Sequence, residues 1–95
     1  MKIEHKKMYE DVKNLLIANA SNPHAKEALA ELVAKTSLEM NHLYEDLGFK
    51  SRTEMGRFMM ENFTSLAKQK PKDKLWKKFL YECIDSIAQI GRAHV

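Results

Sequence analysis

The chain has 95 residues with a mild net charge of +3, and 44% of its residues are hydrophobic while 31% are charged. A chain of this length buries roughly 60–65% of its unfolded surface, enough for one modest core but not two. The composition excludes disorder, and the few glycines and prolines predict a single all-α domain over residues 1–95.

The cysteine content and the length of the apolar runs indicate the cellular compartment of the protein. Cys83 is the one cysteine, which excludes an intrachain disulfide and a metal cage made only of cysteines from one chain. The N-terminal residues lack the apolar run of a signal peptide, and the longest apolar stretches are far short of a membrane span. We therefore expect a cytoplasmic protein with no membrane contact.

The first two predicted helices cover residues 4–20 and 23–46. Asn22 is a good N-cap, and Pro23 suits the first position of a helix. Gly48 suits the left-handed cap that follows the second helix. The second helix has the clearest amphipathic pattern, because its apolar positions recur over six turns. These positions are Ala25, Leu29, Leu32, Val33, Thr36, Met40, Leu43 and Leu47.

The third predicted helix covers residues 52–67. Ser51 and Glu54 have the spacing of a capping box, in which each side chain satisfies a backbone N–H of the other. Gly56 lies inside this helix and costs about 1 kcal/mol of helix propensity relative to alanine. That cost suggests a close helix contact at Gly56.

The fourth predicted helix covers residues 74–90, and Gly91 is expected to stop it and leave a flexible tail at 91–95. Its apolar stripe comprises Trp76, Phe79, Leu80, Cys83, Ile84 and Ile87. Four amphipathic helices with short connections predict a compact helical bundle.

A lysine-rich run at the start of the fourth helix is the strongest functional signal. Residues 68–78 contain six lysines and Trp76, and Phe79-Leu80-Tyr81 follows directly. The lysines have two interpretations. They form either a solvated surface or a docking site for an acidic protein, an oxyanion or a phosphate backbone.

Other candidate chemistry is sparse. Glu39 and His42 form one Glu-x-x-His pair, and His42 is the one candidate metal ligand. Helical metal sites of that kind need a second such motif, and none is present. The sequence has no nucleophile elbow and no phosphate-binding glycine loop. We therefore expect no enzymatic activity.

Residues 41–60 have the outline of a helix-turn-helix unit. Tyr44 occupies a position near the turn where a small side chain usually lets the two helices approach. The second helix offers few base-reading side chains beyond Arg52 and Arg57. Nucleic acid binding is therefore disfavoured.

Several blocks in the second half of the chain match a known pattern. They include NHLYEDLGF at 41–49, Ser51-Arg52, Glu54-Met55, Asn62-Phe63, Leu66-Ala67 and DKLWKKFLY at 73–81. With these blocks the chain resembles the NifQ family over about residues 11–90. That family supplies molybdenum for building the iron–molybdenum cofactor of nitrogenase. The resemblance implies a role in molybdenum handling through partner docking or oxyanion attraction.

The resemblance also implies what this chain would bind. Family members carry a C-terminal cysteine cluster for an iron–sulfur or molybdenum–iron–sulfur cluster, and this chain ends about where the cysteines would begin. We expect no cofactor in the chain as given; molybdenum or an iron–sulfur cluster would bind only if the natural product continues into those cysteines. The expected partner is a nitrogenase cofactor-assembly protein or a molybdenum oxyanion.

The residues expected to contact that anion or partner belong to the matched blocks. They are Arg52, Lys74, Lys77 and Lys78 for positive charge, and Trp76 and Tyr81 for holding the surface in place. His42 is the position where a metal or bound group would be oriented. The alternative is a small helical protein-interaction or regulatory module without a metal.

Overall fold

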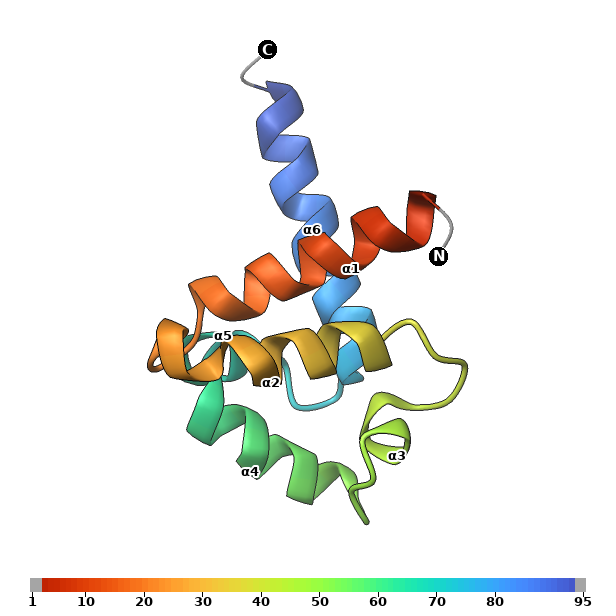
Figure 1. Ribbon diagram of the computed structural model, residues 1–95, viewed down its shortest axis with the longest axis vertical. Helices are drawn as coiled ribbons and strands as arrows, with labels where there is room; N and C mark the ends of the chain where they lie inside the picture. The colour runs from red at the N-terminus through yellow and green to blue at the C-terminus, as the bar shows by residue number, and fades with distance from the viewer. Residues whose placement is uncertain (1–2, 94–95) are drawn as a thin grey trace.

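The computed structural model describes the backbone of residues 3–93 and the side chains of residues 5–88, and these residues form an all-α fold, as predicted (Figure 1). The helices within this part of the chain are α1 (Ile3–Ala18), α2 (Pro23–Thr36), α3 (Leu43–Asp46), α4 (Arg52–Asn62), α5 (Thr64–Gln69) and α6 (Trp76–Ala93). None of them is long and apolar enough to cross a bilayer.

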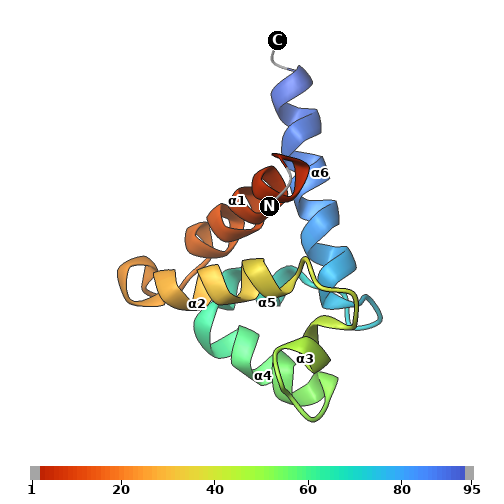
Figure 2. The same ribbon diagram turned by 45° about the vertical axis from the view of Figure 1, so that its right-hand side comes forward.

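One hydrophobic core joins all six helices. α1 packs along α2 and also contacts α6, while α4 packs against α5. Figures 1 and 2 show that the C-terminal half of α6 projects beyond the other helices. The core residues are Val12, Leu16, Ala30, Val33, Ala34, Leu43, Met55, Met59, Phe63, Leu66, Trp76, Phe79 and Leu80.

The predicted second helix is interrupted in the structure. It ends at Thr36, and residues 37–42 form a turning connection before the single turn of α3. The hydroxyls of Thr36 and Ser37 donate to the Leu32 and Ala34 carbonyls, and side chains of this kind compete with helix continuation. The apolar spacing was misleading here, because Met40 is 96% exposed.

The predicted third helix is also divided. Phe63 has non-helical φ and ψ angles of −131° and 58°, and its fully buried side chain joins the core between α4 and α5. Ser21, which is distant in the sequence, supplies hydrogen-bond donors at this break. Its backbone N–H donates to the Asn62 carbonyl over 3.2 Å, and its hydroxyl donates to the Glu61 carbonyl over 3.4 Å. Those carbonyls would otherwise continue the helix.

Three caps that the sequence predicts are present, at Asn22, Gly48 and Ser51. The capping box is only half formed, because among the described residues the Glu54 side chain accepts no bond from the Ser51 N–H. Asn22 Oδ1 accepts from the Ala25 N–H over 3.3 Å, and Ser51 Oγ accepts from the Glu54 N–H over 3.2 Å. Gly48 has a φ of +88°, in the left-handed region.

Two other glycine predictions are wrong. A Cβ built on Gly56 meets no atom within 4 Å, so no close helix contact explains that residue. Helix α6 continues past Gly91 to Ala93. The remaining tail residues, His94 and Val95, lie outside the described residues.

Candidate functional site

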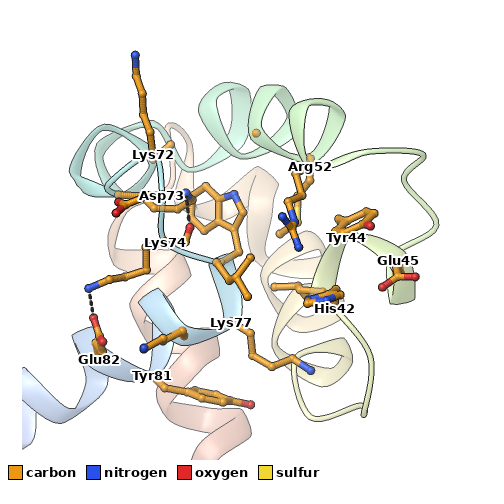
Figure 3. Close-up of a pocket in the computed structure, with 18 of the residues that line it drawn as sticks. His42, Tyr44, Glu45, Arg52, Lys72, Asp73, Lys74, Lys77, Tyr81 and Glu82 are labelled. Atoms are coloured by element: carbon orange, nitrogen blue, oxygen red, sulfur yellow. Dashed lines mark hydrogen bonds and ion pairs between the residues drawn. The ribbon is translucent and has the colours of Figure 1, made fainter.

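An open cleft of about 1270 Å³ lies where α3, α4 and the start of α6 meet (Figure 3). Its walls come from the α2–α3 connection, α3, α4, α5, the α5–α6 connection and α6. All seven residues that the sequence singled out line it, although they come from three separate parts of the chain. They are His42, Arg52, Lys74, Trp76, Lys77, Lys78 and Tyr81.

The cleft has an excess of positive charge. Of the side chains that the structure describes, seven cationic ones and four acidic ones line it. The cations are Arg52, Lys68, Lys70, Lys72, Lys74, Lys77 and Lys78, and the acids are Glu45, Asp73, Glu82 and Asp85. A concave surface of one predominant sign focuses the electrostatic field and raises the local concentration of oppositely charged ligands.

Trp76 forms part of the cleft wall and also anchors it in the core. Its side chain is 8% exposed and packs edge-to-face on Phe79, with ring centroids 5.9 Å apart. The Lys70 ammonium lies 5.3 Å from the Trp76 ring centroid, within cation–π range. Burial lowers the pKa of Lys70, and the charge of Asp73 partly opposes that shift. The indole therefore fixes the position of the lysine-rich connection.

The lysines of this region do not all present free charge. Lys74 forms an ion pair with Glu82, and Lys77 Nζ donates to the carbonyls of Glu39 and Asn41 over 2.6 and 2.7 Å. Lys72 and Lys78 are exposed, and neither forms an ion pair or a hydrogen bond with another residue whose side chain the structure describes. Figure 3 shows Lys77 reaching toward the segment that carries His42 and Lys72 extending away from the cleft floor.

A stack of three side chains forms the opposite wall. The Arg52 guanidinium lies 5.8 Å from the centroid of the Tyr44 ring, and the His42 ring stacks on Tyr44 at 6.0 Å with an interplanar angle of 16°. Arg52 is exposed at the first position of α4, and Ser51 caps this helix. The stack holds the guanidinium beside the cleft while leaving its N–H donors available to an anion.

His42 does not have the setting predicted for a helical metal ligand. Because α2 ends at Thr36, Glu39 and His42 belong to the turning connection, and the expectation that they share a helix face is wrong. Among the described side chains, no group of three or more His, Cys, Asp or Glu residues is placed to hold a metal ion. His42 instead precedes α3 and supports the Tyr44 ring.

Tyr81 and Cys83 lie on the part of α6 next to the cleft. The Tyr81 hydroxyl donates to the Ser37 carbonyl over 2.7 Å, and burial raises the pKa of Tyr81 above its usual value. Burial also raises the pKa of the Cys83 thiol; the Glu82 charge adds to that shift and Lys74 opposes it. Cys83 is half-buried against the core and does not line the cleft.

Sequence reasoning missed several features of the cleft. The sequence names Tyr44 as an obstacle to a helix-turn-helix unit and as part of a matched block, and it places Gly56 at a helix contact, but both residues line the cleft. The pairing of Arg52 with Tyr44 has no signal in local spacing, because α3 and α4 are joined by an irregular segment. α3 is only one turn long, too short for the first helix of a helix-turn-helix unit.

Comparison with known proteins gives a consistent match. The family model described as NifQ matches residues 1–90. Protein NifQ of Azotobacter vinelandii is 35% identical over 75 residues, which is 78% of this chain and 38% of that relative. Protein NifQ of Klebsiella pneumoniae is 40% identical over 53 residues, or 56% of this chain and 32% of the relative.

Protein NifQ of Rhodobacter capsulatus is similar to this chain over a comparable span. It is 37% identical over 71 residues, which is 75% of this chain and 39% of the relative. The matched part of the chain thus spans less than two-fifths of the length of these three relatives. No solved structure matches the chain.

Proposed function

This chain belongs to the NifQ family, and from that premise we propose that it takes part in molybdenum handling for nitrogenase iron–molybdenum cofactor biosynthesis. In this proposal the cleft attracts a molybdenum oxyanion, and the same face docks a cofactor-assembly protein. The domain binds and positions its ligand and does not catalyse a reaction.

The convergence of separate cations on one cleft is the observation that carries the proposal. Arg52 comes from α4, whereas Lys74 and Lys78 come from the lysine-rich run more than twenty positions later. A tetrahedral oxyanion is held by several N–H donors from different directions, and arginine supplies such donors in a fixed planar array. Arg52 and Lys78 are the better candidates, because Lys74 is already paired with Glu82.

The described residues do not fit an iron–sulfur cluster. Such a cluster is held by several thiolates, and this chain has a single cysteine, Cys83. Burial also raises the pKa of that thiol, which favours its protonated form. Molybdenum therefore enters this proposal as an anionic cargo held by cations, with no thiolate ligation from these residues.

Equilibrium dialysis against molybdate and against tetrathiomolybdate tests the proposal. The test variant Arg52→Glu/Lys78→Glu reverses two cleft cations in the first turns of α4 and α6, where acidic side chains favour the helix. The control Lys6→Glu/Lys26→Glu makes the same change in net charge near the starts of α1 and α2, outside the cleft.

We expect the cleft variant to bind at least about tenfold more weakly than the wild type, a loss of about 1.4 kcal/mol. The control should lose much less, because neither Lys6 nor Lys26 lines the cleft. Equal losses in both variants would mean that net charge alone attracts the anion and that the cleft has no special role.

A protein-interaction module without molybdenum is the second candidate. It is favoured by the three exposed apolar side chains that line the same cleft, Met40, Met60 and Leu75. Failure of both anions to bind, together with binding of a protein partner at this face, would support it over the first.

A further inference from the structure

Exposed apolar side chains concentrate in the cleft. Among the described residues, five large hydrophobic side chains are exposed, and three of them line it. Met40 is 96% exposed, Met60 is 44% exposed and Leu75 is 39% exposed. The other two, Leu32 and Ile87, lie on α2 and α6 outside the cleft. Water-exposed apolar groups gathered beside cations are typical of a protein-binding surface rather than of an ion site alone.

The dimensions of the cleft also exceed what an oxyanion needs. Its volume of about 1270 Å³ is larger than the roughly 300–1,000 Å³ of most small-molecule pockets. A tetrahedral anion bound near Arg52 would leave Met60 and Leu75 in water. An occupant that covers these side chains must itself carry apolar groups.

Gly56 lines the cleft without a side chain that would project into it. It lies on α4 one turn before Met60, and a Cβ built there meets nothing within 4 Å. The α4 backbone is therefore open to an approaching chain at this point. A glycine of this kind permits close approach of another backbone without steric conflict.

Charge complementarity specifies the chemistry of the occupant. Among the described side chains, seven cations and four acids line the cleft, and the cations Lys72 and Lys78 are exposed. We propose that the cleft is a docking groove for an acidic amphipathic helix of a partner protein. The apolar side of that helix covers Met60 and Leu75, and its carboxylates meet the lysines. This inference rests on the partner-docking part of the proposed function and does not require molybdate to bind.

The test uses fluorescence anisotropy with a labelled synthetic peptide of defined composition. The peptide is an 18-residue helix with leucines at helical spacing on one face and glutamates flanking them, and it contains no tryptophan. A second peptide has every leucine replaced by glutamine, so it has the same charge without the apolar face. The chain variants are Met60→Ser/Leu75→Ser in the cleft and Leu32→Ser/Ile87→Ser as the matched control outside it.

We expect saturable binding of the leucine-containing peptide by the wild-type chain. The cleft variant should bind it at least about tenfold more weakly, whereas the control should stay within about twofold. The glutamine peptide should bind weakly to every variant. Molybdate binding should be unchanged in Met60→Ser/Leu75→Ser, so failure of this inference and failure of the oxyanion proposal give different results.

Three results would overturn the inference. The first is no saturable peptide binding at about 1 mM, where even a weak specific contact is still measurable. The second is equal affinity for the leucine and glutamine peptides, which would reduce the surface to a patch of charge. The third is tighter binding of a short duplex DNA than of the peptide, with steep weakening by salt, which would make the groove a nucleic acid surface.

Discussion

The ammonium group of Lys77 donates a hydrogen bond over 2.7 Å to the carbonyl oxygen of Asn41, which precedes it by 36 residues. A second bond from the same group reaches the Glu39 carbonyl, and the Tyr81 hydroxyl adds a third tie at Ser37. α6 thus holds the α2–α3 connection in place through main-chain acceptors. That connection carries His42 and Met40 into the cleft.

Replacing Lys77 by methionine should loosen this connection, because two carbonyls lose a charged donor while the apolar stem is kept. We expect a loss of about 1–2 kcal/mol in the free energy of unfolding, measured by urea denaturation. Amide hydrogen exchange at residues 38–42 should accelerate. Lys78→Met is the control, since Lys78 makes no hydrogen bond to the described residues, and it should change stability by less than about 0.5 kcal/mol. Unchanged exchange in Lys77→Met would contradict this role.

Gly56→Ala should stabilise the protein. The new Cβ meets no neighbouring atom, and alanine is favoured over glycine inside a helix by about 1 kcal/mol. Gly48→Ala is the contrasting change, because a φ of +88° strains any residue with a Cβ; it should destabilise by about 1 kcal/mol or more. Thermal and urea unfolding of the two variants should therefore shift in opposite directions. Destabilisation by Gly56→Ala would show that its neighbours lie closer than the structure indicates.

Tyr81 should make the protein less stable at high pH. Burial raises the pKa of Tyr81 in the folded state, so the unfolded chain loses this proton first as pH rises. The contribution of protonated Tyr81 to the free energy of unfolding is therefore complete below the usual tyrosine pKa of about 10. It is lost as the pH rises through the higher pKa of the folded state. Tyr81→Phe should cost about 1 kcal/mol at pH 7, because the Ser37 carbonyl loses its donor. The difference in stability between wild type and variant should shrink above about pH 10. If the stability difference between wild type and Tyr81→Phe grew with pH, the raised pKa of Tyr81 in the folded state would be contradicted.

Cys83 should react slowly with iodoacetamide near neutral pH. Its pKa is raised first by burial and then by the Glu82 charge, and the thiolate is the reacting form. Glu82→Gln should speed alkylation, since it removes an anion and leaves Lys74 unpaired beside the thiol. Lys74→Gln should slow it for the opposite reason. The pH dependence of the alkylation rate separates these effects from simple exposure of the thiol. The electrostatic account fails if the two variants shift that profile in the same direction.

Local signals in the sequence predicted the starts of α2 and α4 correctly, because capping depends on adjacent residues. Asn22, Ser51 and Gly48 act within their own turns, so their roles were readable from spacing. The interruptions at Thr36 and Phe63 were not readable in the same way. Distant donors bond carbonyls at both breaks, Tyr81 at Ser37 and Ser21 at Asn62, in addition to the local hydroxyls of Thr36 and Ser37. A continuous apolar spacing cannot reveal that its carbonyls are taken elsewhere.

The residues that the sequence singled out line one cleft, but the shape of that cleft had no signal in the sequence. A dense lysine run with one tryptophan indicated a basic surface anchored in the core, and Trp76 is buried as that pattern suggests. The partners of the lysines could not be inferred. Asn41 meets Lys77 only through the tertiary fold, and Glu82 lies eight positions from Lys74, which is not an ion-pair spacing within a helix. Met40 matches the apolar stripe of a predicted helix, which favours burial, but its side chain is exposed and lines the cleft.

The most direct test of the account is a molybdate titration of the ¹⁵N-labelled protein, followed by NMR chemical shifts. We expect the resonances of the Trp76 indole N–H, the Arg52 side-chain N–H and the amides around Tyr44 to shift together and saturate. Amides around Lys6 and Lys26 should remain fixed at the same molybdate concentrations. Shifts spread evenly over all the lysine-bearing surfaces, or none at the cleft, would contradict the claim that this cleft draws an anionic ligand.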